Sequence, residues 1–192
     1  MPVRAARDDD HGFISTLDAS LCLEGGEYPF AKPPFGSLFK KHVTGAHATS
    51  HSSTGEQADW DIKFYIIEAQ SGVRAGFAVT SNWLSTDELS QKAGLTTRDI
   101  RLWFVGVQDI FRDKGLAQTA IHHIIDEPRP NNEPGSAFGV YETKLAARLP
   151  RSSVGSSDLL ENYFDFDPQI WNGETIILTC PIWRYARACD AA

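Results

Sequence analysis

The sequence is poor in cysteine and has no long hydrophobic run. Its three cysteines, Cys22, Cys180 and Cys189, are widely spaced and no CxxC pair occurs, so neither a disulfide framework nor a cysteine-based zinc site is indicated. No apolar run approaches about 18 residues, and charged residues follow Met1 almost at once, which is unlike a signal peptide. We therefore expect a soluble, cytoplasmic protein with free thiols.

An excess of basic charge is also lacking. The 192 residues contain 18 Lys and Arg against 25 Asp and Glu, which gives a net charge of −7. The composition therefore does not indicate a broad basic surface that would bind phosphates, and we do not expect nucleic acid as the main partner. With 42% hydrophobic residues, the chain is long and apolar enough to form one compact α/β domain over residues 1–192.

Strand-like and helix-like segments alternate along most of the chain. A short strand and a capped helix are predicted in "VRAARDDDHGFISTL", and the strands "KFYIIEAQ" and "RAGFAVTS" flank turn chemistry at Gly72, which predicts an antiparallel hairpin. The later segments predict a short helix in "STDELSQKAGL", a strand in "AFGVYETK", a helix in "SSDLLENYF" and a last strand in "ETIILTCPI". Residues 44–61 are nearly all small or polar, and we expect a long, flexible surface loop there.

The most informative stretch is "VGVQDIFRDKGLA", residues 105–117. It ends the apolar run "IRLWFVGV", which predicts a central strand, and it leads into a helix whose apolar stripe is formed by Leu116, Ala117, Ala120, Ile121, Ile124 and Ile125. A helix start after a glycine-bearing loop favours anions, particularly phosphates. A nucleotide-phosphate-binding α/β domain stays open here, although neither a P-loop nor a dinucleotide fingerprint is present.

The segment Arg112-Asp113-Lys114-Gly115-Leu116-Ala117 resembles the acyl-CoA pyrophosphate loop, Arg/Gln-x-x-Gly-x-Gly/Ala, of the GCN5-related N-acetyltransferase (GNAT) superfamily. The opening "VRAARDDDHGFI", the hairpin at 63–80, the late strand at 137–143, the helix at 157–164 and the last strand at 174–182 follow the order of that family. The resemblance implies an α/β fold with a mixed, mostly antiparallel central sheet, flanking helices and a splayed acyl-CoA cleft. It also implies an acetyl-CoA-dependent N-acetyltransferase in which a neutral amine attacks the thioester directly.

The same resemblance assigns the acetyl-CoA site to two adjoining stretches. Backbone groups of Phe104, Val105, Gly106 and Val107 are expected to pair with the pantetheine arm like an extra strand. The pyrophosphate is expected on backbone N–H groups of Arg112, Asp113, Lys114, Gly115, Leu116, Ala117 and Gln118. No metal is part of this expectation. The acceptor is expected to be a small-molecule or peptide amine, with no nucleic acid or membrane partner, and a homodimer is compatible with it.

The proton acceptor is less well defined. Some family members carry a general-base Glu on the strand before the loop, and the corresponding residue here is Arg101, which cannot accept a proton. The expected catalytic carboxylates are therefore Asp99 and Glu142, with Glu68 as a third, and an ordered water relay is the alternative.

Tyr163 is the expected proton donor to the leaving thiolate, in the segment "LLENYFDFDP". This segment departs from the family's Tyr-x-x-x-Gly-Phe, because it lacks the glycine, and Glu161 takes the tyrosine position if Phe166 matches the family Phe. The altered tyrosine motif and the missing carboxylate at Arg101 leave open a second interpretation, a catalytically inactive acyl-CoA-binding or protein-interaction module on the same fold.

Several aromatic residues outside the pyrophosphate loop are candidates for an acceptor pocket or for ordinary core. They are Tyr28, Phe30, Phe35, Phe39, Trp60 and Trp83. Together with the acidic balance, they favour a small cationic amine, a peptide N-terminus or a lysine as acceptor. A metal site at His42, His47 and His51 is a minor alternative.

Overall fold

The computed structural model describes residues 3–23, 48–51, 57–60, 62–69, 72–83, 87–127, 143–150, 154–171 and 173–182. In chain order the elements are β1 (Val3–Ala5), the 3-10 turn η1 (Asp8–Asp10), α1 (His11–Leu23), β2 (Ala48–His51), β3 (Gln57–Trp60), β4 (Lys63–Glu68), β5 (Arg74–Asn82), α3 (Glu88–Lys92), β6 (Ile100–Val107), η2 (Asp109–Phe111), α4 (Leu116–Asp126), β7 (Lys144–Pro150), α5 (Val154–Phe164), β8 (Asp167–Trp171) and β9 (Thr175–Pro181).

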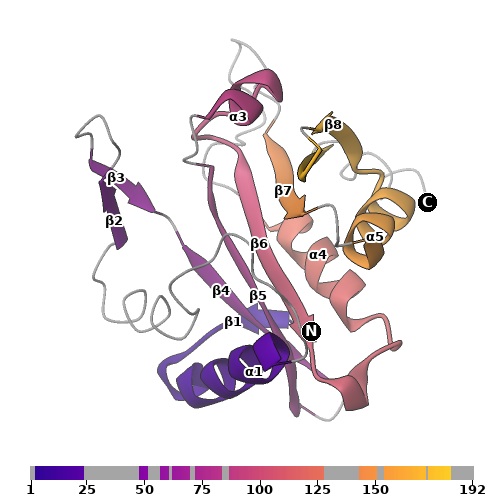
Figure 1. Cartoon of the computed structure of the whole chain (residues 1–192). Helices are drawn as coiled ribbons and strands as arrows, with labels where there is room; N and C mark the ends of the chain where they lie inside the picture. The colour runs from indigo at the N-terminus through magenta and orange to yellow at the C-terminus, as the bar shows by residue number, and fades with distance from the viewer. Residues whose placement is uncertain are drawn as a thin grey trace.

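A seven-stranded sheet in the order β1-β4-β5-β6-β7-β9-β8 forms the centre of the molecule (Figure 1). Its neighbouring strands are antiparallel except for β6 and β7, which run parallel. The sheet is thus mixed and mostly antiparallel, as the sequence predicted. This parallel pair joins the two halves of the sheet. One half consists of β1, β4, β5 and β6, and the other consists of β7, β9 and β8.

Helices cover both faces of the sheet because side chains alternate along each strand. On β4, Phe64 and Ile66 pack in a cluster with Ile14 and Leu17 of α1. Tyr65 and Ile67 point the other way, into a larger cluster with α4 and α5. Since both faces are covered, β4 and β5 are apolar along most of their length instead of alternating with polar residues.

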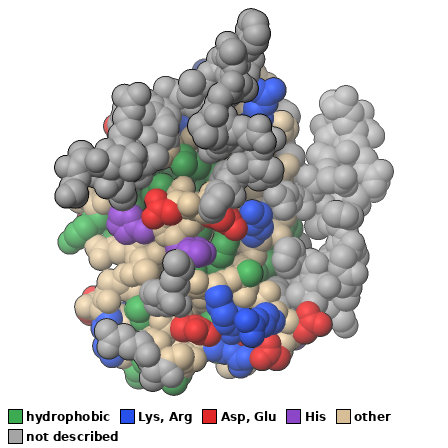
Figure 2. All heavy atoms as spheres, turned by 180° about the vertical axis from the view of Figure 1, so that it is seen from behind, with side chains coloured by type: hydrophobic (Ala, Val, Ile, Leu, Met, Phe, Trp, Pro, Cys, Tyr) green, Lys and Arg blue, Asp and Glu red, His purple; other side chains and the backbone are tan. Residues whose placement is uncertain are grey.

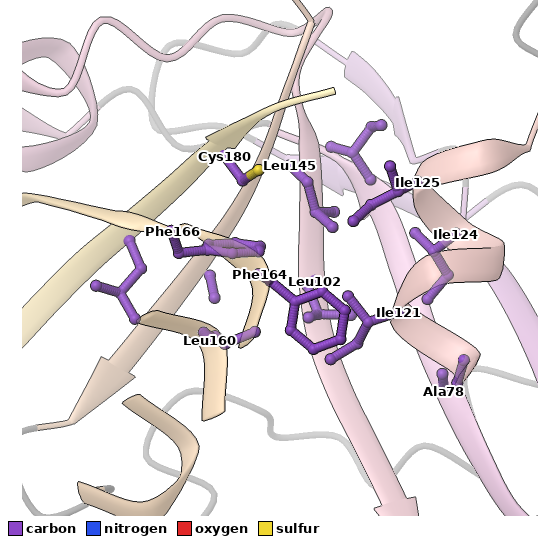
Figure 3. Close-up of a cluster of buried hydrophobic side chains, with 14 of the residues drawn as sticks. Ala78, Leu102, Ile121, Ile124, Ile125, Leu145, Leu160, Phe164, Phe166 and Cys180 are labelled. Atoms are coloured by element: carbon purple, nitrogen blue, oxygen red, sulfur yellow. The ribbon is translucent and has the colours of Figure 1, made fainter. Parts of the chain in front are cut away.

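The larger cluster holds α4 in place. Ile121, Ile124 and Ile125 are at most 3% exposed and meet Leu102 of β6 and Phe164 of α5 in one group of side chains (Figure 3). Burying an isoleucine side chain contributes about 2 kcal/mol, so three of them fix the helix firmly against the sheet. The N-terminus of α4 is therefore held close to the end of β6.

Most of the predicted elements are confirmed, including the first strand and helix, the hairpin of β4 and β5 with Gly72 at φ +76°, the strand β6 and the helix α4. The short helix α3 is also confirmed, with its first turn capped by Asp87, whose side chain accepts a hydrogen bond from the Ser90 N–H.

Three predictions of secondary structure need correction. The expected loop at 44–61 contains the strands β2 and β3, which pair antiparallel. Of the predicted strand "AFGVYETK", residues 137–142 lie outside the described residues, and the strand β7 runs from Lys144 to Pro150 instead. The strand β8 was not predicted because Pro168 interrupts its pattern, and proline is tolerated here since β8 is at the edge of the sheet.

Several predicted features lie outside the described residues, namely Glu142, the aromatic residues between Tyr28 and Phe39, and His42 and His47; the side chains of His51 and Trp60 are not described either. On the face seen in Figure 2, Lys and Arg side chains lie next to Asp and Glu side chains rather than in a broad patch of one sign. None of the helices in the described ranges is long and apolar enough to cross a membrane.

Candidate functional site

The two halves of the sheet part in the middle of β6. The parallel ladder between β6 and β7 covers only Ile100 to Leu102, opposite Leu145 to Ala147. Beyond that point β6 continues to Val107 in register with β5, whereas β7 continues to Pro150 in register with β9. The stretch from Phe104 to Val107 therefore belongs to the first half only, and its other edge faces the place where the strands diverge (Figure 1).

A β-bulge marks the same place. Phe104 is opposite Val79 and Leu102 is opposite Thr80, which leaves Trp103 as an extra residue in β6. Its indole Nε1 donates a hydrogen bond to Ser81 Oγ at 2.8 Å. Bulges bend a strand and increase its twist, so this one helps to turn the end of β6 away from β7.

The chain then passes through η2 and a tight loop into α4. Asp113 has φ +59° and Gly115, the residue before the helix, has φ +71°, so the loop uses two left-handed residues. Arg112 Nη2 lies 2.6 Å from Asp109 Oδ1, and Lys114 Nζ donates to the Ile110 carbonyl at 3.2 Å. The loop is thus closed by its own side chains.

The start of α4 presents backbone donors. Gly115 accepts from the Thr119 N–H at 2.9 Å through its carbonyl, while the N–H groups of the first turn have no intrahelical acceptor. A Cβ on Gly115 would lie 3.4 Å from Gln118 Oε1. These N–H groups and the partial positive charge of the helix end favour an anion such as a pyrophosphate. All residues predicted to bind acetyl-CoA are therefore brought together along β6, the loop and the first turn of α4.

Of the predicted catalytic residues, Asp99 lies just before β6 and Tyr163 lies on α5, and Glu142 is outside the described residues. Asp99 is 3% exposed, its Oδ1 accepts from the Lys144 N–H at 2.8 Å, and its Oδ2 accepts from the N–H and the hydroxyl of Thr96 at 2.7 and 3.1 Å. Asp99 thus ties the start of β7 to the turn before β6, and its catalytic role stays a prediction. Tyr163 is 65% exposed in the last turn of α5, and Glu68 pairs with Arg4.

The structure adds a cluster that sequence reasoning missed. The Arg101 guanidinium carbon lies 3.5 Å from the ring centre of Trp103 and 5.3 Å from that of Trp83. Burial and, to a smaller extent, repulsion from Arg148 lower the pKa of Arg101 to about 10, while attraction by Asp87 opposes the shift. The i, i+2 spacing of Arg101 and Trp103 on a strand was a usable signal, because it predicts one common face.

Solved structures share this arrangement over nearly the whole chain. One is a protein from Desulfovibrio desulfuricans assigned to the GNAT family of acetyltransferases, with 12% identity and a TM-score of 0.59 over 94% of this chain and 98% of that one. Another is the ribosomal-protein-S18-alanine N-acetyltransferase from Escherichia coli, with 14% identity and a TM-score of 0.54 over 94% and 92%. A third is the spermidine N-acetyltransferase from Vibrio cholerae in complex with CoA and spermine, with 14% identity and a TM-score of 0.57 over 96% of both chains.

The chain has the GNAT fold. No protein-family model matches the sequence, and no curated protein does either, so the likeness is one of structure. It confirms the fold that the pyrophosphate-loop motif implied. In this fold the separation of β6 from β7 and the Gly115 loop follow one another directly along the chain.

Proposed function

We propose that this protein is an N-acetyltransferase that uses acetyl-CoA as the acyl donor and an amine as the acceptor. The observation that carries the proposal is the end-to-end arrangement of the β6 edge, which leaves β7 after Leu102, and the helix start behind Gly115. Neighbours with the GNAT fold support it, since one was solved with CoA and the polyamine spermine.

The site residues would hold acetyl-CoA through the backbone. The edge of β6 from Phe104 to Val107 would pair with the amides of the pantetheine arm as an added strand. The N–H groups from Arg112 to Gln118 would bind the pyrophosphate, and the left-handed Gly115 keeps that surface free of a side chain. The bound group supplies an activated acetyl thioester.

The reaction requires one proton acceptor and one proton donor. The amine nitrogen attacks the thioester carbonyl carbon, a C–N bond forms and the C–S bond breaks, the nitrogen loses a proton and the thiolate gains one. We propose Tyr163, exposed at the end of α5, as the donor to the thiolate. Asp99 and Glu142 are the proposed acceptors, and we favour Glu142 or a water relay because both Asp99 oxygens already accept backbone hydrogen bonds.

One observation favours the second function, an inactive acyl-CoA-binding module. The β6 position at which some proteins with this fold carry a general-base Glu holds Arg101, which is stacked on Trp103 and has no proton-accepting atom. Such a module would keep the acetyl-CoA site described above and lack turnover.

Binding and turnover separate the possibilities. Calorimetry should show saturable acetyl-CoA binding, and thermal unfolding should shift with acetyl-CoA but not with ATP or NAD. A thiol-release assay with a panel of amines should then show turnover. Acetyl-CoA binding without turnover on any amine would support the module, whereas stabilisation by ATP or NAD alone would overturn both.

The donor can be tested in the same assay. Tyr163→Phe removes only the hydroxyl, so kcat should fall about 100-fold while the Kd for acetyl-CoA stays unchanged. An unchanged kcat would remove Tyr163 from the mechanism. Tyr65→Phe is the matched control, because the Tyr65 hydroxyl donates to Glu127 Oε2 at 2.6 Å, away from the proposed site.

A further inference from the structure

Arg101 is a mostly buried cation whose guanidinium has no acceptor in the part of the chain that the structure describes. Its recorded contacts are with the rings of Trp103 and Trp83. Stacking covers the flat faces of a guanidinium, while its N–H groups lie in the plane and point outward. Buried charges in proteins are normally paired, and among the described residues no carboxylate pairs with this guanidinium.

The nearby charges do not supply one. Asp87 Oδ2 binds Arg148 Nη1, and Asp87 Oδ1 accepts from the Ser90 N–H at 2.8 Å, so both of its oxygens are engaged. The same two residues also act electrostatically on Arg101: Arg148 repels its guanidinium and Asp87 attracts it. Together, these two arginines and one aspartate of the described chain carry a formal charge of +1.

A second donor is carried by Trp83, whose ring centre lies 5.3 Å from the Arg101 guanidinium carbon. Trp83 is 1% exposed, and its indole Nε1 has no hydrogen-bond partner among the described residues. An unmade hydrogen bond from a buried donor is unfavourable. Arg101 and Trp83 together offer only donors, and a site of donors with an excess of one positive charge fits an acceptor with one negative charge.

The cluster lies next to the proposed reaction site. Arg101 is in the last paired stretch of β6, directly before β7 diverges, and three residues before Phe104, where the proposed pantetheine edge begins. At about 3.3 Å per strand residue the two positions are about 10 Å apart along β6. A small molecule bound at Arg101 can thus extend to the place where the acetyl group would be presented.

We propose that Arg101 and Trp83 bind a carboxylate of the acceptor, so that the acceptor is an amine that also carries a carboxylate, such as an amino acid or a short peptide. This inference rests on the proposed function. A single carboxylate matches the excess of one charge better than a phosphate dianion does, and arginine binds carboxylates in its own plane. The sequence alone favoured a cationic acceptor, because of its aromatic residues and its acidic net charge. The proposed carboxylate site narrows that class to amines that also carry a carboxylate.

The first test does not depend on activity. Binding of N-acetylglycine and of its uncharged analogue N-acetylglycinamide is followed by tryptophan fluorescence with saturating CoA, since Trp83 and Trp103 contact Arg101. The carboxylate should bind at least about tenfold more tightly, as expected for a charge-assisted hydrogen bond. Arg101→Gln should abolish the difference, and Trp83→Phe should weaken carboxylate binding a few-fold. Arg98→Gln is the matched control, because Arg98 is an exposed arginine in the turn just before β6.

The second test uses turnover. Thiol release is measured with glycylglycine against glycylglycinamide and with L-lysine against L-lysinamide. Wild-type protein should prefer the carboxylates in kcat/KM by about tenfold, Arg101→Lys should retain part of that preference, and Arg101→Gln should lose it while still binding acetyl-CoA. Far-ultraviolet circular dichroism checks that each variant is folded.

The outcomes separate this inference from the proposed function. Equal binding of the two fluorescence probes, a preference that survives Arg101→Gln, or no saturable response to the carboxylate would each overturn the carboxylate site. A protein that neither binds acetyl-CoA nor releases thiol, yet discriminates between the two probes, would retain the anion site and overturn the acetyltransferase proposal.

Discussion

Gly76 on β5 lies directly against the backbone of Gly106 on β6. A Cβ placed on Gly76 would be 2.2 Å from the Gly106 carbonyl oxygen and 3.0 Å from the Val107 Cα. The neighbouring pairs in this register are Phe77 with Gly106 and Gly76 with Val107. The close approach is at the end of β6 that we propose to pair with pantetheine, so β5 sets the position of that edge.

We expect Gly76→Ala to destabilise the fold by about 3 kcal/mol, because the new methyl group meets backbone atoms that cannot rotate away. Urea unfolding measures the change. Gly12→Ala in α1 is the matched control, since no atom lies within 4 Å of a Cβ there, and a glycine-to-alanine change inside a helix stabilises by up to about 1 kcal/mol. Equal stability of Gly76→Ala and wild type would contradict the contact.

The β6–loop–α4 unit could be predicted from the sequence because its signals are local. The apolar run of β6, the Gly115 loop and the stripe of Ile121, Ile124 and Ile125 each report on one element and follow one another in the chain. The strand β7, "KLAARLP", could not be predicted, since Arg148 and Pro150 break its apolar pattern. Its place in the sheet comes from pairing with β9, 25 or more residues later in the chain.

The cluster of Arg101, Trp103, Trp83, Asp87 and Arg148 could not be predicted either, because it also depends on contacts between distant segments. The strand period places Arg101 and Trp103 on one face, but Trp83 follows β5, Asp87 caps α3 and Arg148 lies on β7. No local pattern connects these segments, because their contact depends on the sheet order and on the register of β6 with β5 and β7. Arg101 at the position where a general-base Glu was expected was visible in the sequence, whereas the anion site that we propose around it depends on the fold.

Asp10 should be the most sensitive carboxylate to substitution in the described part of the chain. It is 0% exposed, it binds Arg4 Nη1 at 2.8 Å and Arg74 Nε at 2.7 Å, and its Oδ2 accepts from the Arg7 N–H at 2.7 Å. Asp10→Asn removes the buried charge that Arg4 and Arg74 share and leaves each with a more exposed carboxylate, Glu68 and Asp9 respectively, so we expect a loss of about 3 kcal/mol in urea unfolding at pH 7. Asp9→Asn, at a 70% exposed side chain that pairs with Arg74, should change stability by less than about 1 kcal/mol.

The difference in stability between wild type and Asp10→Asn should change with pH in a defined direction. Burial alone would raise the pKa of Asp10, but hydrogen bonds from Arg4 and the Arg7 N–H and the charges of Arg4 and Arg74 outweigh it and lower the pKa below the ordinary 3.8. The folded state therefore binds this proton less tightly than the unfolded state, and the stabilisation is complete above about pH 4 and is lost as the pH falls further. Unfolding at pH 7, 5 and 3 should show the gap between wild type and Asp10→Asn shrinking at pH 3; a gap that widens would contradict it.

Gly115→Val should weaken acetyl-CoA binding strongly. Gly115 has φ +71°, a conformation in which β-branched residues are strained, and it precedes the N–H groups proposed to bind the pyrophosphate. We expect the Kd measured by calorimetry to rise more than about tenfold, the equivalent of about 1.4 kcal/mol. Gly173→Val, at φ +91° between β8 and β9 with no atom within 4 Å of a Cβ, carries a similar backbone strain. Its Kd for acetyl-CoA should stay unchanged, and a similar loss in both variants would point to general destabilisation.

Arg101→Met should make the protein more stable. The lowering of the pKa of Arg101 to about 10 corresponds to an unfavourable burial of charge of about 3 kcal/mol, whereas contacts with two tryptophan rings contribute about 2 kcal/mol of stabilisation. The folded state binds this proton less tightly than the unfolded state, so the penalty is fully present below about pH 10 and a measurement at pH 7 includes it. Urea unfolding should show a gain of about 1 kcal/mol, because methionine fills the space between the rings without a charge.

The matched control for that gain is Arg148→Met. Arg148 binds Asp87, so its removal should destabilise the fold through the partner left behind. A stabilised Arg101→Met variant that no longer prefers carboxylated amines would show that the buried charge is retained for the acceptor and not for the fold. A loss of more than about 1 kcal/mol in Arg101→Met would instead make Arg101 a structural residue held by Trp83 and Trp103, and the argument for a carboxylate site would lose its basis.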